Sequence, residues 1–371
     1  MSKIAFVTSS PMTIKAFLLP FINELMKENE VHVIANWADD IDSSFLPKGV
    51  KLKNLSIERN PSLFSDFITL IKLTRLLQIE KYHTVHTFTP KAGLIGQLAS
   101  YVSRIKNRFH TFTGQVWATQ TGWKKVVLKN LDKVTAALTT AILVDSPSQQ
   151  EYLIQNKVLS KRKSTVLGLG SISGVNLNKF KYSAEKRLSL RAKLGLNEQD
   201  FVFLYAGRLK VDKGIPELIA AFNSVSKNEN CYLVIVGSDE DNLLPLLDKN
   251  KRVIFCGFTD DISSYFSMAD LLCLPSHREG FGNVIIEAAA CKLPALASNI
   301  YGLSDAIDDG TTGILHKVKD REDIELNLKK LIDNKKALAE MRTNAFIRVT
   351  NDFTEDFIVD EFMKFYKCKN K

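Results

Sequence analysis

Short apolar runs alternate with longer segments whose apolar residues recur at helical spacing through most of the chain. An apolar run of about four to eight residues between polar turns is typical of a strand buried on both faces of a sheet. Strands are expected at Ile4–Val7, Val31–Ala35, Val50–Leu55, Thr84–His86, Phe109–Phe112, Ala141–Val144 and Ser164–Leu167. Helices are expected near residues 13–29, 63–80, 91–103, 123–139 and 147–156. This alternation predicts an α/β fold with a parallel, doubly wound sheet that binds ligands at the carboxyl ends of its strands.

The same alternation starts again after a polar, lysine-rich segment at residues 176–198. Strands of the second series are expected at Phe201–Ala206, Cys231–Val236, Val253–Cys256, Leu271–Leu274 and Ala295–Ala297. The sequence therefore predicts two similar α/β domains, residues 1–178 and 179–354. We expect the last segment, residues 355–371, to form a helix that packs back on the first domain. Its apolar residues at helical spacing are Phe357, Ile358, Phe362 and Tyr366.

Length and composition are typical of a globular protein. At 371 residues the chain is long for one domain, and 45% of its residues are hydrophobic while 25% are charged. The first apolar run, Ile4–Val7, is too short for a signal peptide, and no window reaches the roughly 18 apolar residues of a membrane span. The five cysteines lack Cys-x-x-Cys spacing, as is typical of free thiols in a reducing compartment. We therefore expect a cytoplasmic protein.

The excess positive charge is confined to the first half of the chain. Residues 1–180 hold 23 lysines and arginines against 12 aspartates and glutamates, a net charge of +11. Residues 181–371 hold 27 against 29, a net charge of −2. This asymmetry indicates an anionic partner for the first half: a membrane surface, an anionic acceptor or nucleic acid.

The stretch from Ser276 to Cys291 contains a single carboxylate in an otherwise apolar helix. From Gly282 onward the helix is apolar on nearly every side except at Glu287, whose burial requires hydroxyl or cationic partners. Gly280 and Gly282 let the backbone approach a ligand at the helix start, where free N–H groups favour an anion. We therefore expect a phosphate at residues 281–284, with Glu279 and Glu287 accepting hydroxyl hydrogens on either side. The alternative is a structural helix whose glutamate meets an arginine.

A basic turn follows the first strand of the second series. Gly207 and Arg208 lead into Lys213 and Gly214, and two cations at a strand-to-helix turn suit a diphosphate. Such a turn is also common on solvated surfaces. Its occurrence together with the glutamates at 279 and 287 favours the ligand-binding interpretation.

These motifs together resemble the large family of retaining glycosyltransferases with the GT-B fold, usually numbered family 4. The resemblance is carried by Gly207-Arg208-Leu209 with Lys213-Gly214, then Glu279-Gly280-Phe281-Gly282 and Glu287, and by Gly174-Val175-Asn176 with Phe180. It implies two Rossmann-like domains facing a central cleft. The nucleotide-sugar donor would be held mainly by the C-terminal domain and the acceptor mainly by the N-terminal one.

The resemblance also implies roles for the donor-side residues. Arg208 and Lys213 would neutralise the donor diphosphate and the charge that develops as the glycosidic bond breaks. Gly207 and the backbone amides of Phe281, Gly282, Asn283 and Val284 would contribute to donor binding. Glu287 would hold ribose hydroxyls and Glu279 hydroxyls of the transferred sugar. No catalytic base is assigned, and neither a metal nor another cofactor is expected, because no Asp-x-Asp or histidine cluster lies beside the phosphate site.

On the acceptor side, His110 in Arg-Phe-His-Thr-Phe-Thr-Gly resembles the family's active-site histidine. A histidine after a strand is also frequently structural. His86 is a second candidate, and Ser9, Ser10 and Thr13 are placed to line the acceptor side. The chain departs here from relatives with a Gly-Gly pair after the first strand.

Two stretches of the first half are similar to those of bacterial enzymes that build O-antigen or capsule repeat units. They are Ser-Ser-Pro-Met-Thr-Ile-Lys-Ala-Phe at residues 9–17 and His-Thr-Phe-Thr-Gly-Gln-Val-Trp at residues 110–117. These enzymes add a sugar to a polyprenyl-diphosphate-linked acceptor at the cytoplasmic membrane face. For this chain we expect transfer of a hexose or N-acetylhexosamine from a nucleotide sugar, most often a UDP-sugar. A helix over residues 123–139 would suit the anionic membrane surface or pack on its own sheet. It interleaves Lys124, Lys125, Lys129 and Lys133 with Trp123, Val126, Val127, Leu128 and Leu131.

Three other functions remain to be tested. A GT-B sugar-nucleotide epimerase would convert the donor without an acceptor. A nucleic-acid-binding protein would use the basic first half, but its lysines and arginines are scattered and no aromatic-rich recognition motif accompanies them. A membrane-associated scaffold with a degenerate site would leave the intact Arg208, Lys213, Glu279 and Glu287 unexplained.

Overall fold

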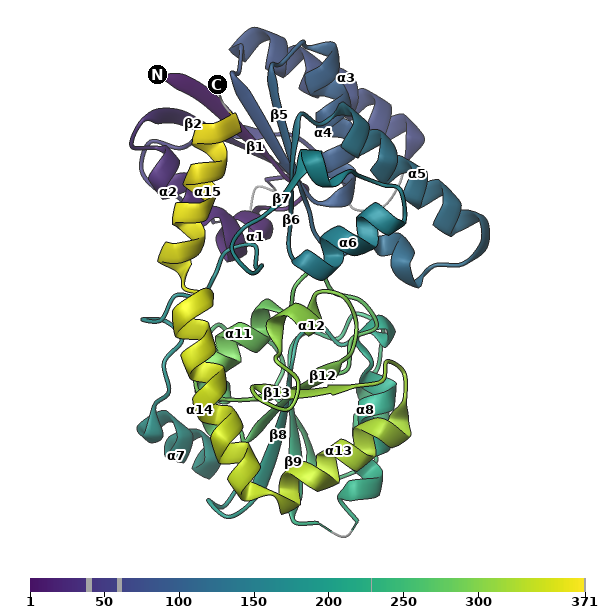
Figure 1. Ribbon diagram of the computed structural model, residues 1–371, viewed down its shortest axis with the longest axis vertical. Helices are drawn as coiled ribbons and strands as arrows, with labels where there is room; N and C mark the ends of the chain where they lie inside the picture. The colour runs from purple at the N-terminus through teal and green to yellow at the C-terminus, as the bar shows by residue number, and fades with distance from the viewer. Residues whose placement is uncertain (38–41, 59–61, 228, 370–371) are drawn as a thin grey trace. The chain divides into compact units, whose positions relative to one another are not determined.

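The computed structural model describes residues 1–37, 42–58, 62–227 and 229–369, and the chain forms two compact units. Unit 1 is Met1–Ser173 with Glu355–Lys371, and unit 2 is Gly174–Thr354 (Figure 1). The chain passes from unit 1 to unit 2 after Ser173, a few residues before the expected boundary at 178. Val175 explains the difference, because its side chain is buried in the core of unit 2 and its N–H donates to the Phe353 carbonyl oxygen at 2.8 Å.

Unit 1 contains a seven-stranded sheet in the order β3-β2-β1-β4-β5-β6-β7, with every neighbouring pair parallel. Its strands are β1 (Ser2–Val7), β2 (Asn29–Ala35), β3 (Lys51–Asn54), β4 (Thr84–Phe88), β5 (Asn107–Phe112), β6 (Ala141–Val144) and β7 (Ser164–Val166). The order reverses between β1 and β4, and in doubly wound sheets ligands bind at the carboxyl ends of the strands beside such a reversal. The expected doubly wound parallel sheet is confirmed.

The helices of unit 1 are α1 (Pro11–Thr13), α2 (Leu19–Leu25), α3 (Leu63–Glu80), α4 (Pro90–Val102), α5 (Gly122–Leu138) and α6 (Pro147–Gln155). Single turns of 3-10 helix lie at η2 (Val116–Thr119) and η3 (Lys161–Lys163). The single helix expected over residues 13–29 is wrong, because a π-helix, η1 (Ile14–Leu18), separates α1 from α2 and α2 ends at Leu25. Pro20 has no N–H to donate to the preceding turn, which accounts for the break in the α-helical hydrogen bonding.

Helix α15 (Glu355–Lys369) belongs to unit 1 and lies alongside α2 (Figure 1). The Phe362 ring stacks on the Phe21 ring of α2 with centroids 4.0 Å apart. The Tyr366 hydroxyl hydrogen-bonds Nδ1 of His86 on β4 at 2.8 Å. These contacts make α15 part of the core of unit 1 although it follows unit 2 in the sequence. Residues 370 and 371 of the expected helix lie outside the described residues.

Unit 2 contains a six-stranded sheet in the order β10-β9-β8-β11-β12-β13, again with all neighbouring pairs parallel. Its strands are β8 (Phe201–Ala206), β9 (Cys231–Val236), β10 (Val253–Phe255), β11 (Leu271–Leu274), β12 (Ala295–Ser298) and β13 (Gly313–His316). The order reverses between β8 and β11, and the two motif-bearing stretches follow these two strands. Strand β13 was not expected, because only two of its four residues are aliphatic.

The helices of unit 2 are α7 (Ala184–Lys193), α8 (Ile215–Val225), α9 (Leu244–Leu247), α10 (Ile262–Met268), α11 (Asn283–Ala290), α12 (Leu303–Ala306), α13 (Arg321–Asp333) and α14 (Lys335–Asp352). A 3-10 turn, η4 (Val211–Lys213), precedes α8. No helix in the described ranges is both long and apolar enough to cross a bilayer. The cysteines are free, as expected from their spacing.

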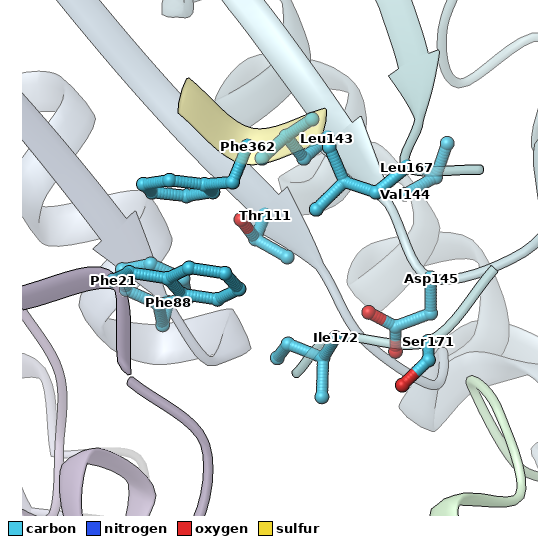
Figure 2. A pocket seen from close by; sticks show the side chains of 10 residues that line it. All are labelled: Phe21, Phe88, Thr111, Leu143, Val144, Asp145, Leu167, Ser171, Ile172 and Phe362. Atoms are coloured by element: carbon cyan, nitrogen blue, oxygen red, sulfur yellow. The ribbon is translucent and has the colours of Figure 1, made fainter. Parts of the chain in front are cut away.

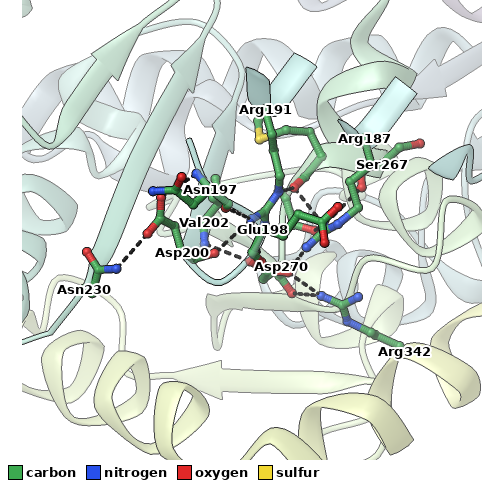
Figure 3. A network of polar contacts seen from close by, with 12 residues as sticks. Arg187, Arg191, Asn197, Glu198, Asp200, Val202, Asn230, Ser267, Asp270 and Arg342 are labelled. Carbon is green, nitrogen blue, oxygen red and sulfur yellow. Dashed lines mark hydrogen bonds and ion pairs between the residues drawn. The ribbon is translucent and has the colours of Figure 1, made fainter. Parts of the chain in front are cut away.

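A buried ion-pair network lies at the amino end of β11, opposite the edge that carries the motifs. Arg187, Arg191 and Arg342 converge on Asp270 (Figure 3). Arg191 is only 1% exposed, and its Nη2 lies 2.7 Å from Asp270 Oδ2. Burial alone would raise the pKa of Asp270, but Arg187 and Arg191 together with the N–H of Val202 bring this pKa below its ordinary value. The network ties α7 and α14 to the sheet.

Candidate active site

The two motif-bearing stretches of unit 2 meet at Gly214. This residue has φ 73°, and a Cβ there would lie 2.1 Å from the carbonyl oxygen of Pro275. A glycine is therefore required for the turn after β8 to approach the turn after β11. The contact brings Lys213 into the same edge of the sheet as Glu279.

Lys213 and Glu279 form an ion pair, with Nζ 2.6 Å from Oε1. Their side chains are 15% and 20% exposed, so the pair is shielded from water on most sides but open on one. Arg208 is more exposed and lies 3.2 Å from Glu240 Oε2, while its carbonyl oxygen accepts a hydrogen bond from the Tyr205 hydroxyl. Lys213 thus pairs with Glu279, whereas Arg208 shares the Glu240 carboxylate with Lys210.

An ion pair and a hydrogen bond between side chains connect the same turns. Arg278 pairs with Asp212 at 3.1 Å, and Nε2 of His277 lies 3.1 Å from Oε1 of Glu217 on α8. The N–H of His277 also donates to the Asp212 carbonyl oxygen at 2.9 Å. These residues were not expected from the sequence, although opposite charges flank both motifs. They fix the turn that carries Glu279.

The start of α11 is tightly packed. Phe281 is buried, and a Cβ at Gly282 would lie 2.7 Å from Cδ2 of Leu303. Gly282 therefore packs closely against Leu303 of α12, and its expected close approach to a ligand stays a prediction. Asn283 and Val284 form the first turn of the helix and are partly exposed. A phosphate at residues 281–284 stays a prediction.

Glu287 is half-buried on α11 and has no hydrogen-bond partner among the described residues. Burial raises the pKa of this carboxyl to about 7, and Lys179 counteracts the rise by its positive charge. The alternative in which a structural arginine pairs with this glutamate is therefore wrong within the described part of the chain. A ligand that donates hydrogen bonds to this unpartnered, half-buried carboxyl would stabilise its ionised form.

In unit 1, His110 lies on β5 and is 2% exposed. Its Nδ1 hydrogen-bonds the Thr87 hydroxyl at 2.8 Å, and burial lowers its pKa to about 3, so the ring is neutral at physiological pH. A Cβ at Gly93 would lie 2.4 Å from Cε1 of His110, so α4 packs directly on the imidazole. His110 also lines a small cavity with Thr89 at the carboxyl end of the sheet.

The serines expected on the acceptor side lie at the same edge of unit 1. Ser9 Oγ is 3.1 Å from the Thr89 hydroxyl, and Ser10 caps α1 by accepting a hydrogen bond from the Met12 N–H. Thr13 ends α1 and is partly exposed. All three residues are therefore reachable from solvent.

His86 does not belong to this group, and its assignment to the acceptor side is wrong. The residue is fully buried, and its Nδ1 and Nε2 hydrogen-bond Tyr366 and Thr111, both at 2.8 Å. Desolvation holds its pKa well below the ordinary value. His86 therefore anchors α15 to the sheet.

A second small cavity follows the carboxyl ends of β4 to β7. Figure 2 shows aromatic rings on one side of it and the polar side chains of Asp145 and Ser171 on the other. The rings are those of Phe21, Phe88 and Phe362. Nowhere in the described part of the chain do three histidine, cysteine, aspartate or glutamate side chains gather in a way that could hold a metal ion. Metal-independent activity stays a prediction.

Comparison with known proteins finds a family model that matches most of unit 2 and relatives that align with most of the chain. Residues 186–348 match the family model described as glycosyl transferases group 1. The capsular polysaccharide biosynthesis glycosyltransferase CapM of Staphylococcus aureus is 34% identical over 320 residues, which cover 84% of this chain and 83% of that protein. The UDP-Gal:alpha-D-GlcNAc-diphosphoundecaprenol alpha-1,3-galactosyltransferase of Escherichia coli is 29% identical over 83% of this chain and 81% of that protein.

Solved structures with the same architecture include HepE of Anabaena in complex with UDP-glucose. Its TM-score is 0.81 at 20% identity, over 99% of this chain and 100% of that chain. Sucrose-phosphate synthase from Thermosynechococcus elongatus gives a TM-score of 0.82 at 22% identity over 99% of both chains. These likenesses establish the fold, and the identity to CapM over most of both proteins establishes homology. The chain therefore belongs to the glycosyl transferases group 1 family and is a glycosyltransferase with the GT-B fold.

Proposed function

We propose that the protein is a retaining glycosyltransferase of capsule or O-antigen synthesis that uses a UDP-sugar and a lipid-diphosphate-linked saccharide acceptor. The donor half rests on two observations in the same unit: the shielded Lys213–Glu279 pair, and the half-buried Glu287 of α11, which has no partner among the described residues. The acceptor half draws on the relative from Escherichia coli, a galactosyltransferase of α-D-GlcNAc-diphosphoundecaprenol. The transferred sugar is a hexose or an N-acetylhexosamine.

Donor binding would rearrange the charges of the site. The diphosphate carries two negative charges, which Lys213 and Arg208 can neutralise only by turning away from Glu279 and Glu240. Glu279, once released, accepts hydrogen bonds from hydroxyls of the transferred sugar. The amides of residues 281–284 and the turn at Gly207 add donors to the phosphates, and Glu287 accepts from the ribose hydroxyls. The two cations then stabilise the leaving UDP.

The acceptor would bind at the carboxyl edge of the sheet in unit 1. The neutral imidazole of His110 can exchange hydrogen bonds with sugar hydroxyls, and the nearby Ser9, Ser10 and Thr13 offer further hydroxyl groups. We assign no protein nucleophile or base to the transfer step, and no metal.

We further propose that α5 contacts the anionic cytoplasmic face of the membrane. Trp123 is 72% exposed, and Val126, Val127 and Leu131 are also exposed on this helix. Lysines interleave with these residues, which is the composition of an interfacial helix. Flotation with vesicles containing phosphatidylglycerol tests this contact. Trp123→Ser should reduce binding, and equal binding to neutral vesicles would contradict it.

The central experiment combines a binding screen with a transfer assay. A nucleotide at about 100 times its dissociation constant stabilises its protein by roughly 2.7 kcal/mol, so a thermal-shift screen of UDP and UDP-sugars should single out the donor. Transfer from that donor to α-D-GlcNAc-diphosphoundecaprenol is then followed by mass spectrometry. Retention of the anomeric configuration in the product, read by NMR, tests the retaining mechanism.

The same experiment separates the alternatives. Conversion of the UDP-sugar without an acceptor would indicate an epimerase, and salt-sensitive oligonucleotide binding without affinity for UDP would indicate a nucleic-acid-binding protein. Arg208→Ala should lower transfer by orders of magnitude while the fold survives. Normal transfer by this variant would refute the proposed role of the basic turn.

A further inference from the structure

The cavity beside His110 is closed on one side by a carboxyl group to which no role has been given so far. Asp132 of α5 lines this cavity together with His110, Thr89 and Gln115. The cavity has room for about one water molecule or one hydroxyl group. It lies at the carboxyl ends of β4 and β5, the edge at which we place the acceptor.

Asp132 uses only one of its two carboxyl oxygens within the protein. The indole N–H of Trp117 donates to Oδ2 at 2.7 Å, and Oδ1 has no partner among the described residues. Lys129 is engaged elsewhere, since its Nζ hydrogen-bonds Asn156 and lies over the Trp117 ring. The side chain is half-buried. An oxygen in this position can accept a hydrogen bond from a group that enters the cavity.

The hydrogen bonds around His110 leave its second ring nitrogen available. Nδ1 lies 2.8 Å from the Thr87 hydroxyl, and that hydroxyl oxygen also accepts from Nε2 of Gln97 at 2.8 Å. Nε2 of His110 has no hydrogen-bond partner among the described residues. A cavity lined by a carboxylate and by this neutral imidazole suits a sugar hydroxyl, which can donate one hydrogen bond and accept others.

We propose that Asp132 is an acceptor-binding residue: its Oδ1 accepts a hydrogen bond from a hydroxyl of the acceptor sugar in the cavity beside His110. The inference rests on the proposed function and deepens it. It makes α5 contribute to sugar recognition as well as to the membrane contact. If Asp132 had a structural role alone, it would only accept the hydrogen bond from the Trp117 indole.

Binding through a carboxylate predicts a pH dependence. Burial raises the pKa of Asp132 to about 6, and the Trp117 hydrogen bond opposes this rise. Below that pH the protonated carboxyl loses the charge-assisted hydrogen bond, so acceptor affinity falls. Other titratable groups lie on the elements packed around it or around Trp117: Lys124, Lys125, Lys129 and Lys133 on α5, Lys91 and Tyr101 on α4, Arg108 and His110 on β5, and Glu151 and Tyr152 on α6. His110, with a pKa of about 3, stays neutral from pH 5 to 7.5.

Two variants separate recognition from structure. Asp132→Asn keeps an oxygen for Trp117 but removes the charge, whereas Trp117→Phe keeps the carboxylate and removes the internal hydrogen bond. Dissociation constants are measured by microscale thermophoresis with α-D-GlcNAc-diphosphoundecaprenol in detergent, and with UDP as the control. At pH 7.5 we expect Asp132→Asn to weaken acceptor binding about tenfold or more and to leave UDP binding unchanged. Trp117→Phe should change acceptor binding far less.

The wild-type protein supplies a test that needs no variant. Its acceptor dissociation constant should rise about tenfold between pH 7.5 and pH 5, because a group of pKa about 6 is then about 90% protonated. A flat profile, unchanged binding by folded Asp132→Asn, or an equal loss in Trp117→Phe would overturn the inference. Failure of the wild type to transfer sugar would refute the proposed function as well, whereas an active wild type with an indifferent Asp132→Asn refutes this inference alone.

Discussion

Replacement of Glu287 by glutamine should stabilise the ligand-free protein while weakening UDP binding. Burial raises the pKa of this carboxyl from 4.5 to about 7. The folded state therefore binds more protons than the unfolded state between these two values, and stability falls as pH rises through this range. At 1.36 kcal/mol per pKa unit, the ionised carboxylate costs about 3 kcal/mol at pH 8, or roughly half of that once partial exposure to water is considered.

The ionised Glu287 carboxylate should strengthen UDP binding. If ribose hydroxyls donate only to its ionised form, the dissociation constant for UDP rises about tenfold from pH 8 to pH 6, because the ionised fraction falls from about 90% to about 10%. Glu287→Gln should lack this part of the pH dependence and bind UDP about ten- to a hundredfold more weakly at pH 8. Measuring both proteins over the same pH series cancels the titration of UDP itself.

Calorimetric titration with UDP and thermal unfolding at pH 5 and pH 8 provide both quantities. Glu340→Gln, which changes an exposed carboxylate of the same unit, is the matched control and should leave both unchanged. The reasoning is refuted if Glu287→Gln is less stable than the wild type at pH 8. It is equally refuted if UDP affinity keeps its wild-type value and pH slope.

Three further changes test other parts of unit 2. Lys213→Ala should lower turnover about a hundredfold or more, whereas Lys329→Ala, which removes a surface pair on α13, should have little effect; similar rates in both would exclude Lys213 from the site. Gly214→Ala should destabilise far more than Gly195→Ala in urea unfolding, because both have positive φ but only the first meets another backbone; equal losses would contradict the steric argument. Asp270→Asn should cost about 3 to 5 kcal/mol by leaving buried arginines unpaired, and the folded variant should bind UDP normally.

Much of the fold could be predicted because its strands are buried on both faces and therefore read as apolar runs. Strand β13 was not predicted, because Gly313 and His316 interrupt its short apolar run. The π-helix was not predicted either, because the apolar spacing around Pro20 is equally compatible with an unbroken α-helix. The spacing of apolar residues indicates which positions are buried. It does not indicate how a helix adjusts its hydrogen bonds around a proline that lacks an N–H.

The candidate site was less predictable, because its polar contacts join residues that are distant in sequence. The partners of His86 are Thr111 and Tyr366, which lie 25 and 280 positions away, so no local pattern distinguished a buried anchor from an acceptor-binding residue. Lys213 and Glu279 could be associated only through a family motif, and their direct pairing depends on how two turns pack. Asp132 lies among lysines in a sequence that indicates a surface helix, and only its bond to Trp117 reveals an inward orientation.

The return of α15 to unit 1 sets the order in which the protein can be completed on the ribosome. Helices α2 and α15 share a core, yet more than three hundred residues separate Phe21 from Phe362 along the chain. During synthesis, the apolar face of α2 and the imidazole of His86 must wait until all of unit 2 has been translated. Unit 2, which is continuous in sequence, can fold first, and the unit that begins the chain is finished last.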